Sequence, residues 1–390
     1  MMRIAYVCAD PGIPVFGCKG CSIHVQEIIR ALLKQGHHVE LFATRLDGEP
    51  PLDLAQVPLH QLPIIPKSNR AGRETAALSA NLDLRLALEN GGDFDLIYER
   101  YSLWSFTAME YARAANIPGI LEVNAPLIEE HAQHRGLVNH EAAYEVAGRV
   151  FGAATALIAV SQGVADYLAS YAVAQGRIHV IPNGVNPQRF PLNLKPAIAT
   201  PKEVFTVGFV GTMKPWHGLS TLIEAFEILH RADNTTRLLI VGDGPAKDEL
   251  LELANRSLSD AVHLTGAVTA AEIPGLLASM DAAVAPYPQQ SHFYFSPLKV
   301  YEYMAAGLPV VASNIGQISH LLQDHKNGLL CTPGDALQLA ALLYHLRLQP
   351  KVRSRLGQAA RQTVLEHHTW DAVVQQTLAL VKRSSVVEVS

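Results

Sequence analysis

The chain has 390 residues, a formal net charge of −5 and a hydrophobic fraction of 49%. Because a single hydrophobic core stops growing at about 250 residues, this length predicts two compact domains. The sequence has no long basic run and no recognisable nucleic-acid module, so nucleic acid is not an expected partner. Its four cysteines do not form the pattern of a secreted disulfide scaffold, and Cys18 and Cys21 are interpreted as small residues of a glycine loop.

The apolar segments are too short for a targeting or membrane-spanning role. The first of them, Met1–Val7, reads as a buried strand and is shorter than the core of a signal peptide. No later segment reaches the about 18 uninterrupted apolar residues that a membrane span needs. We therefore expect a cytoplasmic protein and leave open a peripheral contact with the inner face of a membrane.

Short apolar, β-rich runs alternate with amphipathic helical stretches along nearly the whole chain, which is typical of parallel α/β layers. Twelve strands are predicted, at Arg3–Cys8, Val39–Ala43, Asp95–Glu99, Gly119–Val123, Ala156–Val160, His179–Pro182, Phe205–Val210, Arg237–Val241, Ala261–Thr265, Ala282–Ala285, Pro309–Ala312 and Gly328–Cys331. They divide into two similar sheets. The sequence therefore predicts two Rossmann-like domains that face a deep cleft.

A Pro- and Asn-rich stretch without apolar periodicity separates the two sets of strands and predicts a linker. The predicted domains are residues 1–190 on the acceptor side, a linker at 191–203, a donor-binding domain at 204–368, and a C-terminal helix at 369–390 that crosses back to the first domain. Ligands of open parallel sheets bind at the carboxyl ends of the strands, so a site is expected where these ends face the cleft.

Residues 296–309 form the most informative segment. Ser296 suits the N-cap of a helix, Pro297 its first position and Gly307 the position after its end. The amides and the positive dipole end of such a helix form an anion site, to which Lys299 adds a charge. A diphosphate is the expected ligand.

Glu302 follows about one turn further along this helix. At about 1.5 Å per residue it lies roughly 7–8 Å from the helix start, near the span from a pyrophosphate to a ribose. Its carboxylate can accept hydrogen bonds from both ribose hydroxyls. A Lys299–Glu302 surface pair is an equally good interpretation of the spacing.

This segment resembles the donor-binding motif of glycosyltransferase family four, the retaining enzymes of the GT-B fold, in a subgroup with Ser-Pro-Leu-Lys-x-x-Glu-Tyr-Met in place of the usual two glutamates. Segments from about residue 3 to residue 382 resemble the family in the same order. In the family, the glutamate that matches Glu302 binds the ribose. The resemblance implies a donor-binding set of Ser296, Pro297, Leu298, Glu302, Gly211, Thr212, Gly242, Gly266, Val268 and Tyr294.

The N-terminal loop is similar to the family's glycine loop, which faces the donor phosphate and the acceptor. Gly17 and Gly20 let the backbone approach a ligand closely, and Lys19 is a candidate phosphate or acceptor contact. His24, on the following helix, is interpreted as structural. The acceptor is expected near two stretches of the first domain, Tyr98–Tyr101 at a strand end and Glu129–His131 beyond Asn124. Arg100 is a candidate acceptor contact with an ion pair as its alternative, and Tyr101 and Trp104 stack on the acceptor or simply pack.

Three departures from the family surround the transferred sugar. The usual Arg and Lys of the loop after the first donor-domain strand are replaced by Thr212 and His217, which leaves Lys214 as the expected main cation. The first of the paired glutamates is replaced by Tyr294, and a histidine near the donor sugar by Asn124. The expected catalytic residues are thus Lys214, Asn124 and Lys299, with no metal ligand.

The resemblance implies a retaining, metal-independent hexosyltransferase that needs no cofactor and takes a UDP-sugar or GDP-sugar as co-substrate. Its acceptor is a hydroxyl of a polysaccharide, a glycolipid or a small molecule. Two alternatives remain open on the sequence alone, a nucleotide-sugar epimerase of the same fold and a non-catalytic subunit that binds the nucleotide sugar.

Overall fold

The computed structural model describes residues 1–255, 258 and 260–387, and the chain forms two compact units. Unit 1 comprises Met1–Asn183, the short segment Tyr294–Ser296 and the chain from Trp370 onward. Unit 2 comprises Gly184–Phe293 and Pro297–Thr369. Along the part of the chain that the structure describes, no helix has the length and apolar character that a membrane span requires.

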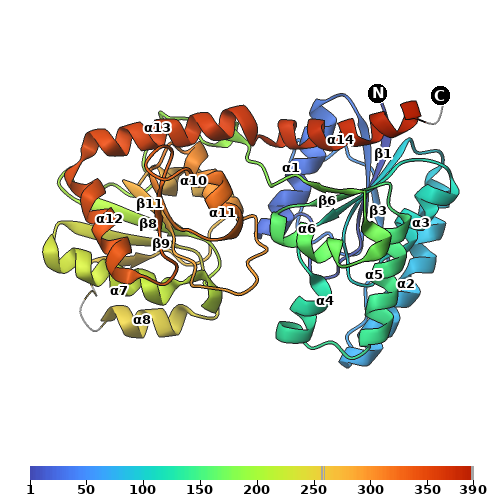
Figure 1. Ribbon diagram of the computed structural model, residues 1–390, viewed down its shortest axis with the longest axis horizontal. Coiled ribbons are helices and arrows are strands. Elements are labelled where there is room, and N and C mark those ends of the chain that lie inside the picture. Colours follow the sequence, from blue (N-terminus) through green and yellow to red (C-terminus); the bar gives the residue numbers. More distant parts are fainter. Residues whose placement is uncertain (256–257, 259, 388–390) are drawn as a thin grey trace. The chain divides into compact units, whose positions relative to one another are not determined.

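Unit 1 is built on a seven-stranded sheet in the order β3-β2-β1-β4-β5-β6-β7, and every neighbouring pair is parallel (Figure 1). All residues of β4, β5 and β6 are buried, as expected for parallel strands covered on both faces. The strands are β1 (Arg3–Cys8), β2 (His38–Ala43), β3 (Leu59–Gln61), β4 (Leu96–Arg100), β5 (Gly119–Val123), β6 (Ala156–Ala159) and β7 (Ile178–Val180).

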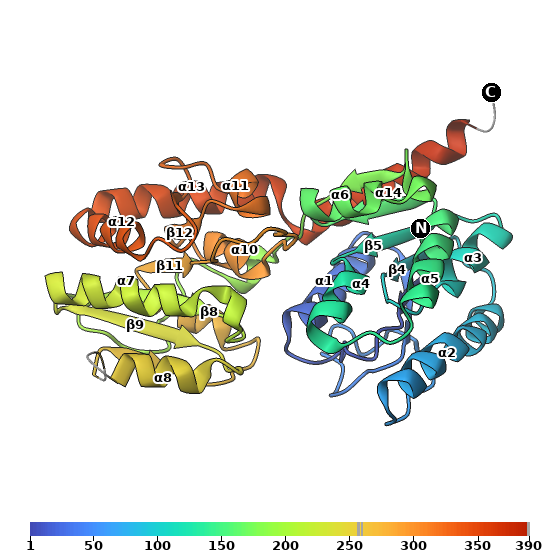
Figure 2. The ribbon, with the colours of Figure 1, turned by 60° about the horizontal axis from the view of Figure 1, so that its bottom comes forward.

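The helices of unit 1 pack in two groups. The C-terminal helix α14 lies along α1, whereas α3 contacts both α2 and α5 (Figures 1 and 2). The helices are α1 (Gly20–Lys34), α2 (Arg70–Gly91), α3 (Thr107–Ala114), α4 (Leu127–Glu130), the π-helix η1 (His131–Arg135), α5 (His140–Ala153), α6 (Gln162–Ala169), the 3₁₀ turn η2 (Ala172–Ala174) and α14 (Trp370–Val387).

Unit 2 holds a six-stranded parallel sheet in the order β10-β9-β8-β11-β12-β13. Helix α12 packs on α7, and α13 packs on α10 (Figure 1). The strands are β8 (Phe205–Val210), β9 (Thr236–Val241), β10 (Val262–Leu264), β11 (Ala282–Ala285), β12 (Val310–Ser313) and β13 (Leu329–Cys331). The helices are η3 (Pro187–Arg189), η4 (Pro215–His217), α7 (Leu219–Ala232), α8 (Lys247–Asn255), α9 (Ile273–Leu277), α10 (Leu298–Ala305), α11 (Gly316–Leu321), α12 (Ala336–Leu348) and α13 (Pro350–His367).

All twelve predicted strands form, with ends that agree to within one or two residues. Strand β3, Leu59–Gln61, is not among the predicted strands; it is a short edge strand whose middle residue is a histidine. It pairs only with β2, and its leucine and glutamine ends are exposed, so it carries no apolar signal.

The predicted start of helix α10 is wrong by one residue. The helix begins at Leu298, and the N-cap position is Pro297, whose side chain cannot accept a hydrogen bond. The Ser296 hydroxyl instead accepts a hydrogen bond from the Asn183 N–H at 3.1 Å. The hydroxyl that the local pattern assigns to capping the helix is therefore bound to a residue far away in the sequence. At the other end, Gly307 has φ +73° and lies just beyond the last helical turn, as predicted.

Each sheet reverses its strand order at the first strand of its unit. Strand β1 lies between β2 and β4, and β8 lies between β9 and β11. In open parallel sheets, ligands bind outside the carboxyl ends of the strands at such a point. The loops that follow β1 and β4 in unit 1, and β8 and β11 in unit 2, are therefore the places where each unit is built to hold a ligand.

Candidate active site

Three glycine loops meet at the carboxyl edge of the sheet of unit 2. Gly211 follows β8, Gly242 follows β9, and Gly266 follows β10; the Gly242 N–H donates to the Gly266 carbonyl at 3.1 Å. Gly211 has φ +142° and Gly242 has φ +136°, backbone conformations that favour glycine. A Cβ atom on Gly242 would lie 2.2 Å from the Gly211 carbonyl oxygen. The predicted donor glycines thus form one tightly packed surface.

Lys299, in the first turn of α10, places its ammonium group directly beneath this surface. Its Nζ atom lies 4.1 Å from the centre of the Phe209 ring and 5.6 Å from that of Tyr287, and a Cβ on Gly211 would lie 2.9 Å from it. Among the described residues this Nζ atom has no hydrogen-bond partner. Burial lowers the pKa of Lys299 to about 7, against the opposing effect of the Glu302 carboxylate.

Glu302 is held by an arginine that no sequence motif pointed to. The Arg189 Nη1 atom lies 3.1 Å from Glu302 Oε1, and Arg189 Nη2 donates to the Ala270 carbonyl at 2.9 Å. The alternative of a Lys299–Glu302 surface pair is wrong, because Lys299 is buried against aromatic rings while Glu302 pairs with Arg189. No local pattern reveals this pair, since its members are 113 residues apart.

The loop after β8 carries a neutral histidine where the family has a cation. His217 Nδ1 donates to the Thr212 carbonyl at 2.6 Å. Burial and the charges of Lys299 and Lys214 lower the pKa of His217 to about 3. Lys214 lies over Trp216, with Nζ 5.4 Å from the ring centre. The loop therefore presents Lys214 as its charged side chain.

In unit 1, the buried carboxylate of Glu122 collects hydrogen bonds from several predicted site residues. Tyr98 donates at 2.5 Å, Asn124 at 2.6 Å and Arg100 at 3.3 Å. Burial opposes ionisation of Glu122, but the Arg100 charge and the hydrogen bonds from its neighbours lower the pKa of Glu122. Arg100 pairs with Glu122, so its guanidinium is part of a buried ion pair.

His24 completes this network, in agreement with its structural interpretation. Its Nε2 atom lies 3.1 Å from Glu122 Oε1, and its Nδ1 atom accepts from Arg100 at 3.1 Å. Only the neutral ring satisfies both contacts. Burial is the largest effect and lowers the pKa of His24 to about 4. The ring also packs edge-on against Trp370 of α14, with ring centres 4.9 Å apart.

The remaining predicted residues of unit 1 divide between the core and the surface. Tyr101 is buried and packs against Phe151, so the packing alternative describes it. Lys19 and Gly20 are exposed at the start of α1, and Gly17 lies half-buried before them. The flanking Cys18 and Cys21 are free thiols.

Tyr294 belongs to unit 1, in the short segment that separates the two pieces of unit 2. Its hydroxyl donates to Glu130 Oε2 at 3.2 Å, and its carbonyl accepts from the Ser161 hydroxyl at 2.6 Å. Burial raises the pKa of Tyr294. Of the other predicted donor residues, Leu298 and Val268 are half-buried and lie within unit 2.

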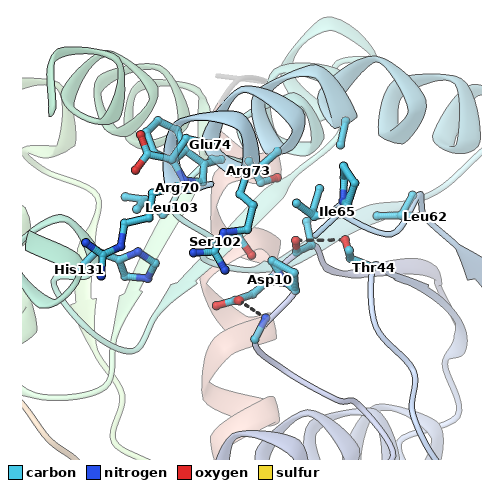
Figure 3. A pocket seen from close by; sticks show the side chains of 18 of the residues that line it. Asp10, Thr44, Leu62, Ile65, Arg70, Arg73, Glu74, Ser102, Leu103 and His131 are labelled. Atoms are coloured by element: carbon cyan, nitrogen blue, oxygen red, sulfur yellow. Dashed lines mark hydrogen bonds between the residues drawn. The ribbon is translucent and has the colours of Figure 1, made fainter. Parts of the chain in front are cut away.

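A cavity of about 460 Å³ lies in unit 1 at the carboxyl ends of β1 and β4 and the start of α2 (Figure 3). Its titratable lining residues are Asp10, Lys67, Arg70, Arg73, Glu74, His131 and Arg135. Of these, the sequence pointed only to His131, in the stretch beyond Asn124 that is expected near the acceptor.

The chain matches two family models that together span most of its length. Residues 19–189 match Glycosyltransferase Family 4, and residues 204–347 match Glycosyl transferases group 1. The chain is 26% identical over 407 residues to MMP alpha-(1->4)-mannosyltransferase of Mycolicibacterium hassiacum, a match that covers 94% of this chain and 95% of that relative.

Solved structures of the same fold cover almost the whole chain. Sucrose-phosphate synthase from Thermosynechococcus elongatus has a TM-score of 0.75 at 20% identity, over 99% of this chain and 100% of its own. HepE from Anabaena, solved in complex with UDP-glucose, has a TM-score of 0.73 at 20% identity, over 98% and 100%. The chain therefore has the GT-B fold and belongs to the family 4 glycosyltransferases, enzymes that transfer glycosyl groups.

Proposed function

We propose that the protein is a retaining, metal-independent hexosyltransferase whose donor is a nucleotide-diphosphate sugar bound by unit 2. The observation that carries the proposal is the Lys299 ammonium group, buried beneath the Gly211 loop at the start of α10. Among the described residues its Nζ atom has no hydrogen-bond partner, and a buried amine left in this way is costly, so it marks a place where an anion is expected.

The groups around Lys299 match the parts of such a donor. The diphosphate lies over the Gly211 loop, where close backbone approach and the positive end of α10 favour it. Glu302 accepts hydrogen bonds from the ribose hydroxyls, and Arg189 holds its carboxylate in place. A carboxylate that is already oriented loses little freedom when the ribose binds.

Charge on the departing diphosphate is met by side chains of this chain. Lys299 takes up a proton when the phosphate arrives, and Lys214 adds a second positive charge from the loop after β8. Preorganised cations act on charge as it develops in the transition state, which is the largest single contribution in many enzymes. Retention follows from the family resemblance, with the departing phosphate taking the acceptor proton.

We propose a UDP-sugar as the donor. HepE, which shares this fold, was solved with UDP-glucose. The hexosyl group is supported by the mannosyltransferase named among the relatives. A GDP-sugar is the other donor that the test must include.

Thermal unfolding in the presence of EDTA tests the donor site. Wild-type protein is melted with UDP, GDP and ADP and with their common hexose conjugates, beside Glu302→Ala. A ligand that binds only the folded state raises the melting temperature by mass action. We expect a rise with one nucleotide series that is lost in Glu302→Ala. Glu227→Ala, which removes a surface ion pair with Arg231 on α7, is the matched control and should behave as wild type. A folded wild-type protein that no nucleotide stabilises would overturn the proposal.

A further inference from the structure

The lining of the unit 1 cavity combines basic and apolar side chains. Its volume of about 460 Å³ falls in the range of small-molecule sites. Figure 3 shows the side chains of Arg70 and Arg73 extending from the start of α2 into the cavity, with His131 nearby. Leucines, among them Leu62, Leu84 and Leu103, also line the cavity.

Three basic side chains of the lining carry a positive charge that no described acidic side chain pairs with. Within the described part of the chain, neither Arg70 nor Arg73 forms an ion pair, and Lys67 at the same rim also has none. The two carboxylates in the lining have other partners. Glu74 accepts from the N–H groups of residues 138 and 139 at 2.9 and 2.8 Å, and Asp10 accepts from Gly12 at 2.7 Å.

A buried hydroxyl in the same cavity lacks a partner. Ser102, just after β4, is 4% exposed, and among the described residues its Oγ atom makes no hydrogen bond. Buried polar groups are almost always paired, so an orphan that lines a cavity indicates a ligand oxygen. An acceptor atom between Ser102 and the α2 arginines would satisfy both.

We propose that this cavity binds the acceptor and that the acceptor carries a phosphate ester. The proposal rests on the glycosyltransferase function above and names the substrate class of its second ligand. The phosphate lies between Arg70 and Arg73, whose planar guanidinium groups suit phosphate oxygens. The body of the acceptor lies against the leucines and Trp104. An uncharged acceptor could pair with the Ser102 hydroxyl but would leave the two arginines without a counter-charge.

Isothermal titration of the full-length protein tests this assignment. The probes are glucose 6-phosphate, octyl phosphate, glucose and inorganic phosphate, and the variant is Arg70→Gln/Arg73→Gln. The matched control is Arg85→Gln, at the other end of α2, where Arg85 pairs with Glu89 on the surface. We expect a phosphate ester to bind at least tenfold more tightly than glucose and inorganic phosphate, with a tenfold or greater loss in the double variant alone. Ser102→Ala should weaken binding by a smaller factor.

The probes distinguish a soluble phosphate ester from a lipid-linked one, and they test this inference separately from the donor proposal. Tighter binding of glucose 6-phosphate indicates a soluble sugar phosphate, and tighter binding of octyl phosphate indicates a lipid-linked acceptor; both support the assignment. Equal affinity of the double variant and wild type, or no ester binding above that of inorganic phosphate, overturns it. UDP is titrated in parallel into every variant. Intact UDP binding with absent ester binding sinks this inference alone, whereas the reverse sinks the donor proposal alone.

Discussion

At the scale of single residues, the buried charge of Glu122 fixes the position of the predicted site residue Asn124. Glu122 is 2% exposed and binds Asn124, Arg100 and His24 at once. A buried carboxylate with several donors is held firmly, and removing one donor leaves an uncompensated charge. Asn124 is thereby held at the end of β5. Glu122 and the side chains bound to it therefore stabilise the loops that follow the strands of unit 1.

His24 makes the stability of unit 1 depend on pH. Its pKa of about 4 in the folded protein lies below the ordinary 6.5, so the unfolded chain takes up the proton first as the pH falls. The stabilisation is fully present above about pH 6.5 and declines towards pH 4, by at most about 1.4 kcal/mol per pH unit. Urea unfolding of wild type and His24→Gln across this range measures it. The variant, less stable at pH 7, should show the smaller pH slope; equal slopes would contradict the assignment.

The proposed nucleotide binding by unit 2 should depend on pH through Lys299. With a pKa of about 7 in the free protein, it is mostly neutral at pH 8.5 and must take up a proton to face a diphosphate. We expect UDP affinity to fall by a factor that approaches ten per pH unit above about pH 7.5. Titrations in buffers of different ionisation enthalpy should show uptake of up to one proton. Lys299→Met should bind UDP more weakly and without this uptake; an unchanged uptake in that variant would assign the proton to another group.

At the scale of elements, the loops after β8 and β9 constrain each other. Gly242→Ala combines an unfavourable φ with a Cβ atom 2.2 Å from the Gly211 carbonyl oxygen, so the backbone must shift. We expect a loss of about 3 kcal/mol or more in the free energy of unfolding, together with weaker UDP binding. Gly334→Ala is the matched control, since Gly334 has φ +81° in the same unit and a Cβ there meets nothing within 4 Å. It should cost about 1 kcal/mol and leave UDP binding intact. Equal losses of unfolding free energy in the two variants would show that the contact between the Gly211 and Gly242 loops does not contribute.

Local sequence patterns predicted the helices and strands well but predicted the hydrogen-bond and ion-pair partners of single residues poorly. The apolar strands were found because burial on both faces leaves a continuous apolar run, as in β8 and β12. The short edge strand β3 lacks that run. The capping role of Ser296 and the surface pair of Glu302 failed for a different reason: Asn183 and Arg189 reach these groups from more than 100 residues away. No pattern within one helix contains such contacts.

Most of the lining of the unit 1 cavity, beyond His131 and Trp104, was missed for the same physical reason. Its lining comes from loops after β1 and β4, from the start of α2 and from η1, which the sheet topology brings together. In the sequence, Arg70 and Arg73 look like ordinary exposed helix residues. Only the folded arrangement places Ser102 and the leucines beside them. By contrast, the glycine loops after β8, β9 and β10 could be predicted because each carries its own glycine motif.

At the scale of the whole molecule, the chain returns to unit 1 at its end. Helix α14 packs on α1, and the Lys34–Asp371 ion pair and the His24–Trp370 contact join the two helices (Figure 1). Unit 1 is therefore complete only when the last helix has been made. Trp370 is 5% exposed, so the contact is part of the core of unit 1.

This closure predicts that Trp370→Ala weakens unit 1 more than unit 2. Removing a buried tryptophan typically costs about 3–5 kcal/mol, and here it also exposes His24 and the Glu122 charge beneath it. Hydrogen exchange with mass spectrometry should show faster exchange in β1, α1 and α14, with little change in the strands of unit 2. Asp371→Ala is the matched control, because the exposed pair with Lys34 is worth at most about 1 kcal/mol and its loss should leave both units protected. Uniformly faster exchange across both units in Trp370→Ala would contradict this prediction. It would mean that the chain unfolds as one cooperative body, with loss of α14 destabilising unit 2 as strongly as unit 1.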